Sequence, residues 1–190
     1  MKNLSKIYSH FLKNSKEYRE IMKIVKLNNK GKSWLIGGFV YRNLANLLYK
    51  TPVKKDSDID VIMENQPKKF RSMKSWKINR NFFGNPKFVN GSNRLDLIPL
   101  ASIYHFKTQN IKPTIKNYLK VTRYSVESIA FDIQNKKLIG PIGIKSLLER
   151  KIAINNLTSA KLSFHHRNVS VKKLLLEKAK SLNFEIVKKL

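Results

Sequence analysis

One short stretch constrains the fold more than any other: an apolar run, Ser33 to Ile36, that passes directly into the pair Gly37-Gly38. Apolar residues then recur at helical spacing from Val40 to Leu48. This order predicts a buried strand over 33–36, a glycine turn and a helix over 39–50. Such a turn presents backbone N–H groups at a helix start, where phosphate oxygens bind, although a tight turn without a ligand would have the same sequence.

Three aspartates stand out because the chain holds only twelve acidic residues in 190. Asp58 and Asp60 alternate with apolar residues in a predicted strand, 58–63, and therefore project from one face. Asp96 lies in the second strand of a predicted hairpin, 87–89 and 94–100. Three carboxylates on neighbouring strands would suit two Mg²⁺ ions. The alternative is that Asp58 and Asp60 face solvent or pair with lysines.

The other segments predict a mixture of helices and short strands. Ser15 is placed as the N-cap of a second N-terminal helix. We expect helices over 1–14, 15–28, 114–121, 144–150 and 169–190, a hairpin over 126–133 and 137–139, and a short strand over 152–154. Residues 66–88 have no clear pattern.

Three motifs resemble the nucleotidyltransferase superfamily that includes DNA polymerase beta. They are Ile36-Gly37-Gly38-Phe39-Val40, Asp58-Ile59-Asp60-Val61 and Leu95-Asp96-Leu97. The pattern is most similar to the head domain of bacterial poly(A) polymerases and CCA-adding tRNA nucleotidyltransferases, which carry G-G-x-V-R-D followed by D-x-D. Segments 123–132, 139–144 and 181–185 also resemble that family, so the similarity covers residues 33–186.

The resemblance implies an α+β nucleotidyltransferase fold, with a mixed β-sheet flanked by helices and a short helical C-terminal neck. We expect an N-terminal helical segment over 1–30, the head over 31–140 and the neck over 141–190. The implied activity is Mg²⁺-dependent, template-independent transfer of NMP from an NTP to an RNA 3′ end, such as that of tRNA, with release of pyrophosphate. The implied catalytic and metal residues are Asp58, Asp60 and Asp96, and the implied nucleotide contacts are Gly37, Gly38, Ser33, Arg42 and Arg123.

The sequence also departs from the family. Tyr41-Arg42 replaces the Arg-Asp of the first motif, and Arg123 and Glu127 stand where the family has Asp and Asn. The base-reading E-D-x-x-R-x-x-R element aligns with 167–174, which lacks it. In the family, helical body and tail domains that hold tRNA follow the neck. The resemblance therefore does not predict CCA addition itself, nor which base is added.

The net charge of 39 − 12 = +27 favours a polyanionic partner, of which RNA is the one we expect. DNA, an anionic membrane surface or a bias in base composition would also account for it. The residues we expect to grip RNA are Lys68, Lys69, Arg71 and Lys74, with Trp76 either stacking on a base or packing in the core. The chain lacks cysteine and any apolar run long enough to span a membrane, so we expect a cytoplasmic location.

Two other functions remain open. One is transfer of AMP to a protein or small molecule, as in minimal nucleotidyltransferases of toxin and antitoxin systems. The other is a catalytically inactive RNA-binding module that kept the fold. Three carboxylates at one site argue against the second, because grouped acids repel one another.

Overall fold

The computed structural model describes residues 2–29, 31–53, 58–167 and 169–190. Its helices are α1 (Lys2–Asn14), α2 (Lys16–Asn28), α3 (Gly37–Tyr49), α4 (Tyr104–Thr108), α5 (Ile115–Lys120), α6 (Pro141–Glu149), α7 (Leu157–Arg167) and α8 (Val171–Leu182), with 3₁₀ turns η1 (Leu100–Ser102) and η2 (Ser125–Glu127). The strands are β1 (Ser33–Ile36), β2 (Ile59–Met63), β3 (Lys77–Arg80), β4 (Pro86–Asn90), β5 (Asn93–Pro99), β6 (Ala130–Asp132), β7 (Lys137–Ile139), β8 (Lys151–Ile152) and β9 (Glu185–Ile186). Within these ranges, none of the helices has the length and apolar character needed to cross a bilayer.

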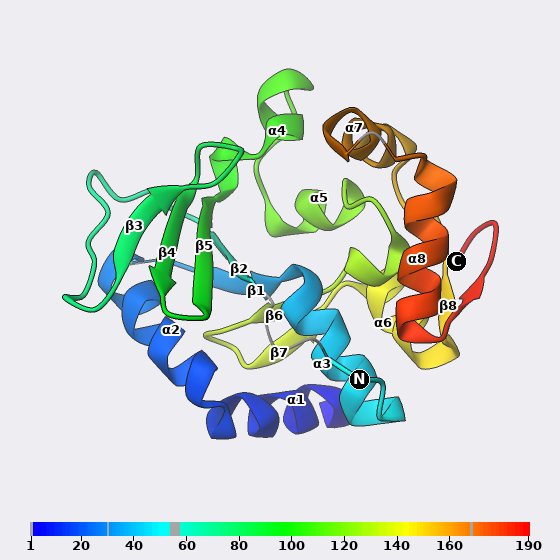
Figure 1. Cartoon of the computed structure of the whole chain (residues 1–190), viewed down its shortest axis with the longest axis horizontal. Helices are drawn as coiled ribbons and strands as arrows, with labels where there is room; N and C mark the ends of the chain where they lie inside the picture. The colour runs from blue at the N-terminus through cyan, green and yellow to red at the C-terminus, as the bar shows by residue number, and fades with distance from the viewer. Residues whose placement is uncertain (1, 30, 54–57, 168) are drawn as a thin grey trace.

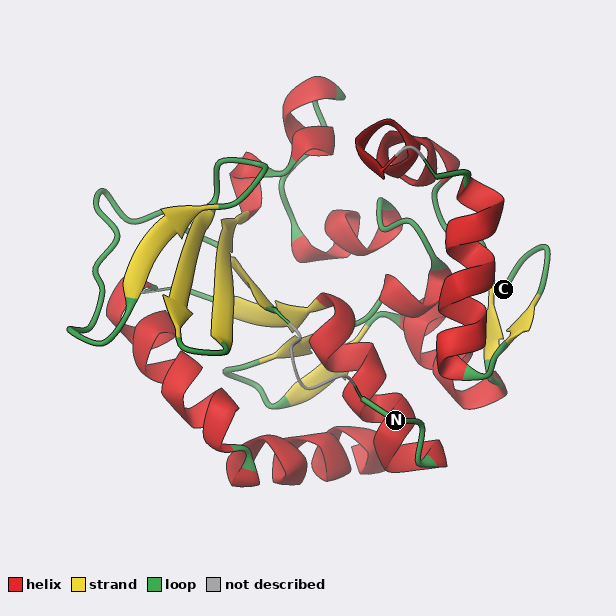
Figure 2. Cartoon of the chain, in the orientation of Figure 1, coloured by secondary structure: helices red, strands yellow, loops and turns green. Residues whose placement is uncertain are grey.

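Seven strands form one mixed sheet in the order β3-β4-β5-β2-β1-β6-β7. All neighbouring pairs are antiparallel except β2 and β5, which run parallel. Helices lie around the sheet, with α1 and α2 along one side (Figures 1 and 2). This architecture confirms the expected α+β fold with a mixed sheet flanked by helices.

The alternation of side chains along the strands divides the sheet into two faces with different coverings. On one face, Val61 and Leu97 join the larger hydrophobic cluster with residues of α1, α2, α3, α6 and α8. On the other face, Ile62 joins a smaller cluster with Phe106 of α4 and Leu119 of α5. Asp60 and Asp96 alternate with the first set, so they belong to the face that α4 and α5 cover in part.

The larger cluster draws on all parts of the chain. Tyr8 of α1, Leu35 of β1, Ile144 of α6 and Leu175 of α8 all belong to it and are buried. The N-terminal helices and the C-terminal helices therefore pack on one continuous core with the sheet.

Several sequence expectations need adjustment. The Ser15 hydroxyl does accept from Tyr18 N and cap α2, as predicted. Strand β3 and helices α4 and α7 were not predicted, and the expected strand 126–133 is a 3₁₀ turn followed by β6. The last helix stops at Leu182 rather than continuing to 190, because Asn183 adopts a left-handed conformation with φ of 56° and the chain turns into β9.

Candidate functional site

The glycine turn brings the start of α3 against an acidic side chain of β2. Ile36 and Asp60 are partners in the register of β1 and β2. Gly37 has a φ of +67°, and an added Cβ there would lie 2.8 Å from Asp60 Oδ2. Only glycine fits this close approach without displacing the carboxylate. The N-cap residue Ile36 has no side chain that caps α3, and no hydrogen bond from another described side chain to the first N–H groups of the helix is observed, so these groups can bind a ligand.

The three predicted aspartates lie together. Asp60 and Asp96 stand opposite each other in the parallel register of β2 and β5, and Asp58 directly precedes β2. Burial, together with the charges of Asp96 and Asp58, raises the pKa of Asp60 to about 7, although the nearby cations Lys87 and Arg42 act in the opposite direction. Burial likewise raises the pKa of Asp96. The structure thus groups carboxylates that repel one another, which is typical of a cation site.

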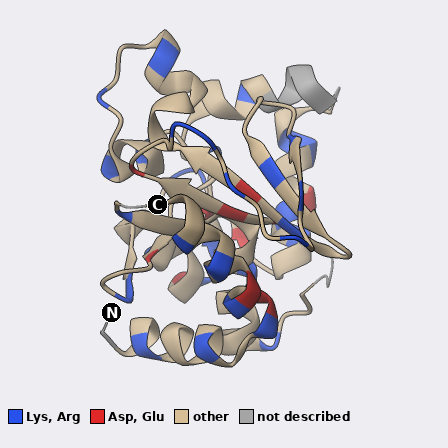
Figure 3. Cartoon of the chain, turned by 90° about the vertical axis from the view of Figure 1, so that its left-hand side faces the viewer, with Lys and Arg blue, Asp and Glu red and all other residues tan. Residues whose placement is uncertain are grey.

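Basic and amide side chains from the hairpin already contact these acids. Lys87 Nζ lies 2.7 Å from Asp58 Oδ2, and Arg94 Nη1 lies 3.8 Å from Asp58 Oδ1. Asn81 Nδ2 donates to Asp96 Oδ2 at 2.9 Å. In Figure 3, acidic positions on the central strands lie beside basic positions on neighbouring strands. The repulsion among the acids is therefore partly offset within the chain.

The acids fit a divalent cation by their chemistry. Carboxylate oxygens are the ligands that Mg²⁺ prefers. Two of them, Asp58 Oδ1 and Asp96 Oδ1, are buried without a hydrogen-bond partner among the described residues. In the observed side-chain positions, the part of the chain that the structure covers has no group of three or more His, Asp or Glu close enough together to hold a metal ion. A bound cation would require the carboxylates to turn toward it from the basic side chains.

Arg42 of α3 lies beside the glycine turn. Its guanidinium packs against Gly38, where an added Cβ would come within 2.8 Å of Nη1. Its charge lowers the pKa of Asp60, and its Nε is buried without a hydrogen-bond partner among the described residues. The structure thus brings Gly37, Gly38 and Arg42 together with the acids.

Ser33 is not brought to this site. It lies at the end of β1 away from Gly37, roughly 10 Å along a four-residue strand. Its side chain is buried, and its hydroxyl accepts from Gln134 Nε2 at 3.1 Å. The observed contacts give Ser33 a structural role between β1 and the turn after β6.

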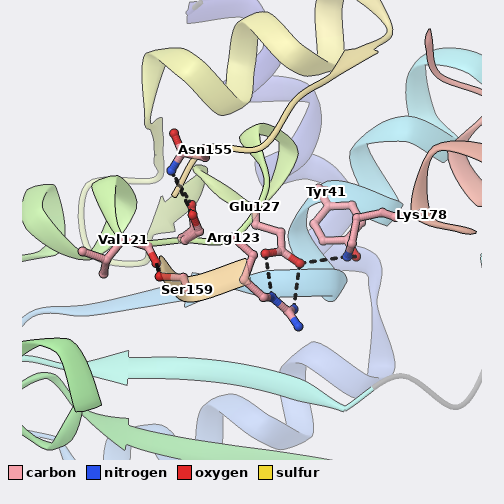
Figure 4. A network of polar contacts seen from close by, with 8 residues as sticks. Tyr41, Val121, Arg123, Glu127, Asn155, Ser159 and Lys178 are labelled. Atoms are coloured by element: carbon pink, nitrogen blue, oxygen red, sulfur yellow. Dashed lines mark hydrogen bonds and ion pairs between the residues drawn. The ribbon is translucent and has the colours of Figure 1, made fainter. Parts of the chain in front are cut away.

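Arg123 belongs to an ionic network beside the site (Figure 4). Its Nε and Nη2 donate to the Glu127 carboxylate at 3.1 and 2.8 Å, and Lys178 Nζ of α8 lies 2.8 Å from the same carboxylate. Lys178 also donates to Tyr41 Oη at 2.8 Å. Burial would raise the pKa of Glu127, but the two cations lower it to about 2. The network therefore ties α8 to α3, directly after the glycine turn.

The four predicted RNA-gripping residues lie on the other side of the sheet. Lys68, Lys69, Arg71 and Lys74 are exposed. The backbone of Arg71 bonds to the Asn28 side chain at the end of α2, and neighbouring Phe70 and Met73 pack on the larger cluster. Trp76 is only 4% exposed and belongs to that cluster, so the core alternative for Trp76 is the correct one. The apolar residues of this segment therefore pack on the face of the sheet opposite to Asp60 and Asp96.

Sequence reasoning missed two contacts of the acids, from Lys87 and Asn81. The signal for Lys87 was present, because the predicted hairpin turn pairs Asn90 with Asn93 and so sets Lys87 opposite Asp96. Asn81 precedes a turn in a segment without clear periodicity, and nothing in the sequence would have revealed it. The missing base-reading element, 167–174, includes residues outside the described part of the chain.

The fold is similar to solved structures of tRNA-processing enzymes. The Thermotoga maritima CCA-adding enzyme complexed with tRNA matches 95% of this chain with a TM-score of 0.58 at 19% identity. A tRNA nucleotidyltransferase complexed with a primer tRNA and an incoming ATP analogue matches 88% with a TM-score of 0.53 at 18% identity. A CCA-adding enzyme with ATP matches 83% with a TM-score of 0.54 at 21% identity.

In the opposite direction, the chain spans 42%, 46% and 35% of those three structures. No protein-family model matches the sequence, and no curated protein matches it. The likeness therefore concerns three-dimensional structure over less than half of each enzyme. The chain has a nucleotidyltransferase fold related to the head domain of CCA-adding enzymes.

Proposed function

We propose that this chain transfers a nucleoside monophosphate from an NTP to the 3′ end of an RNA and releases pyrophosphate. The observation that carries the proposal is the register of β2 and β5. It sets Asp60 opposite Asp96 and close to Asp58. Asp60 also lies so close to Gly37 that a Cβ added there would be 2.8 Å from its Oδ2. Grouped carboxylates beside an uncapped helix start suit a triphosphate whose charge is neutralised by cations.

The glycine turn and Arg42 would hold the nucleotide. The first N–H groups of α3 point from a 13-residue helix whose dipole favours negative charge at this end. Arg42 lies against Gly38, from which its guanidinium can reach phosphate oxygens. The similar solved structures of a tRNA-processing enzyme with CTP and of a CCA-adding enzyme with ATP support an NTP as the substrate. These residues position the α-phosphate for in-line attack.

Asp58, Asp60 and Asp96 would hold Mg²⁺, with two ions expected. When bound, Mg²⁺ supplies positive charge at the reacting phosphate and lowers the pKa of the attacking hydroxyl. The carboxylates of this chain would orient those charges, and Lys87 would have to move from Asp58 to make room for a cation there. Asp58 Oδ1 and Asp96 Oδ1, which are buried and accept no hydrogen bond from any described residue, support this assignment.

RNA is the acceptor that the charge favours. The net charge of +27 provides a strongly positive field that attracts polyanions. Two of the similar solved structures hold tRNA or a primer tRNA. An RNA 3′ end, including that of a tRNA, is therefore the proposed acceptor.

The test is incubation of the purified protein with Mg²⁺, total RNA and each of four labelled NTPs in turn. Asp60→Asn should abolish labelling and leave RNA binding nearly unchanged, since it removes one charge from a chain of net +27. Glu149→Gln removes an exposed carboxylate of α6 and is the matched control with full activity. A parallel incubation replaces the RNA with cell-lysate protein, and label that enters lysate protein but not RNA would favour AMP transfer to a protein. No transfer to either acceptor would favour the third possibility, a catalytically inactive RNA-binding module.

A further inference from the structure

The turn between β3 and β4, residues 81–85, carries two exposed aromatic rings and is called the aromatic turn below. The rings of Phe82 and Phe83 are 77% and 69% exposed, more than any other large hydrophobic side chain in the described part of the chain. Their centroids lie 5.3 Å apart at an interplanar angle of 88°. Exposed rings of this kind mark a binding surface, because a flat apolar partner that covers them removes apolar area from water and so lowers the free energy.

Hydrogen bonds hold the aromatic turn in one shape. Asn81 Oδ1 accepts from the backbone N–H groups of Phe83 and Asn85, each at 3.0 Å. Arg80 Nη1 donates to Gly84 O at 2.7 Å. Because the backbone of the turn is already held in place, little conformational entropy is lost when a partner stacks on the rings.

The aromatic turn lies directly beside the acids, on the side away from the glycine turn. Asn81 Nδ2 donates to Asp96 Oδ2 at 2.9 Å. The sheet order places the acid-bearing strands β2 and β5 between β1, which leads into Gly37, and β4 and β3, which carry the aromatic turn. If the glycine turn holds the nucleotide, the second substrate must approach from the side of the aromatic turn.

Basic side chains share the acid-bearing face of these strands. The registers of β3, β4 and β5 align Lys77 with Val89 and Arg94, and Asn79 with Lys87 and Asp96. Side chains aligned in this way lie on one face of the sheet. Lys77 and Arg94 are both exposed. Lys77 and Arg94 lie toward the β4–β5 turn, so Lys77 is roughly 13 Å along β3 from Asn81. A single strand of several nucleotides that stacks on the rings would reach these cations with its backbone phosphates.

We propose that the aromatic turn, together with Lys77 and Arg94 farther along the acid-bearing face of the same sheet, forms the docking surface for the single-stranded 3′ end of the acceptor RNA. Phe82 and Phe83 stack on unpaired bases, and Lys77 and Arg94 contact backbone phosphates. This inference rests on the proposed function, because it names where that function's acceptor binds. Stacking on a ring accepts every base, so this surface would fix the position of the 3′ end and leave its sequence unread.

The experiment measures RNA binding without NTP or Mg²⁺, by fluorescence anisotropy. The probes are a labelled ten-nucleotide single-stranded RNA and the same RNA with abasic residues at its last two positions. Removal of both rings in the variant F82A/F83A should weaken binding of the intact RNA by roughly tenfold or more. The wild type should bind the abasic RNA with a similar loss, and the variant should no longer distinguish the two probes. Leu176→Ala, which truncates a 50% exposed side chain of α8, is the matched control and should change neither affinity.

Salt dependence separates stacking from phosphate contacts. The variant F82A/F83A should keep the wild-type slope of affinity against salt, whereas Lys77→Gln should flatten it by about 0.7 for one lost phosphate contact. Equal affinities of wild type and F82A/F83A for intact RNA would overturn the proposal, and so would an equal loss on both probes. A wild-type dimer that becomes monomeric in the variant with unchanged RNA affinity would show that a second copy covers the rings, which also overturns it. Because these binding measurements contain no NTP, they test the docking surface even if the protein fails to transfer a nucleotide.

Discussion

Lys87 Nζ lies 2.7 Å from Asp58 Oδ2, so a cation from β4 already occupies part of the acid site. The position of Lys87 follows from the hairpin register, which sets it opposite Asp96. Its charge lowers the pKa of both Asp60 and Asp96. One ammonium therefore offsets the repulsion of all three carboxylates and competes with a divalent cation for them.

The variant Lys87→Met tests this competition. Without the ammonium, the three carboxylates repel one another more strongly, so the metal-free protein should lose about 1 kcal/mol of stability. The same change should tighten Mg²⁺ binding several-fold, because no internal charge must be displaced. Isothermal titration with Mg²⁺ and thermal unfolding in EDTA measure the two effects. Lys77→Met, on the same face of β3, should change neither, and weaker Mg²⁺ binding by Lys87→Met would contradict the competition.

Asp60→Asn should stabilise the metal-free protein even though it abolishes transfer. Burial and the charges of Asp96 and Asp58 disfavour the Asp60 carboxylate, and an amide of the same shape avoids that cost. We expect a gain of about 1–2 kcal/mol at pH 8 in EDTA. Mg²⁺ should raise the melting temperature of the wild type and not that of the variant. A variant less stable than the wild type in EDTA would mean that Asp60 serves packing rather than cation binding.

The close approach of Gly37 to Asp60 is testable against a second glycine with the same backbone strain. Gly37 and Gly84 have φ of +67° and +77°, so alanine costs about 1 kcal/mol of strain at either position. At Gly84 an added Cβ meets no atom within 4 Å, whereas at Gly37 it lies 2.8 Å from Asp60 Oδ2. Gly37→Ala should therefore displace the carboxylate and abolish both transfer and Mg²⁺-dependent stabilisation.

The control Gly84→Ala should keep Mg²⁺-dependent stabilisation and lose only stability. Differential scanning fluorimetry with and without Mg²⁺ compares the two variants directly. If both variants respond to Mg²⁺ as the wild type does, the contact between Gly37 and Asp60 has no part in cation binding.

Short sequence patterns predicted those parts of the structure that depend on neighbouring residues, such as the alternation of side chains along a strand and the residues of a turn. They located β1, the glycine turn and the three aspartates, because a two-residue period and a glycine pair are visible in the sequence. They could not say where the residues expected to grip RNA lie relative to the acids, since the position of Lys68 depends on how the long connection after β2 packs on α2. The place of Ser33 was hidden for a similar reason, because the direction of β1 puts it at the end of the strand away from Gly37. Such placements depend on tertiary packing that no local pattern encodes.

The network of Glu127 with Arg123 and Lys178 should govern acid stability. Because the pKa of Glu127 is about 2 in the folded protein and 4.5 ordinarily, its ionisation stabilises the fold above pH 4.5. That stability is lost as pH falls from 4.5 toward 2 and amounts to about 3 kcal/mol. Glu127→Gln leaves both cations without their anion and should cost about 3–5 kcal/mol at pH 7.

Urea unfolding of the wild type and Glu127→Gln at several pH values tests this sign. The difference in unfolding free energy should be constant from pH 5 to 7 and should shrink steadily below pH 4.5, as the wild-type carboxylate takes up its proton. Glu149→Gln removes a carboxylate that is 41% exposed and 4.0 Å from Lys145, so it should change stability by less than about 0.5 kcal/mol at every pH. A difference for Glu127→Gln that stays the same from pH 7 to pH 3 would show that the side chain stabilises α8 through packing instead of charge.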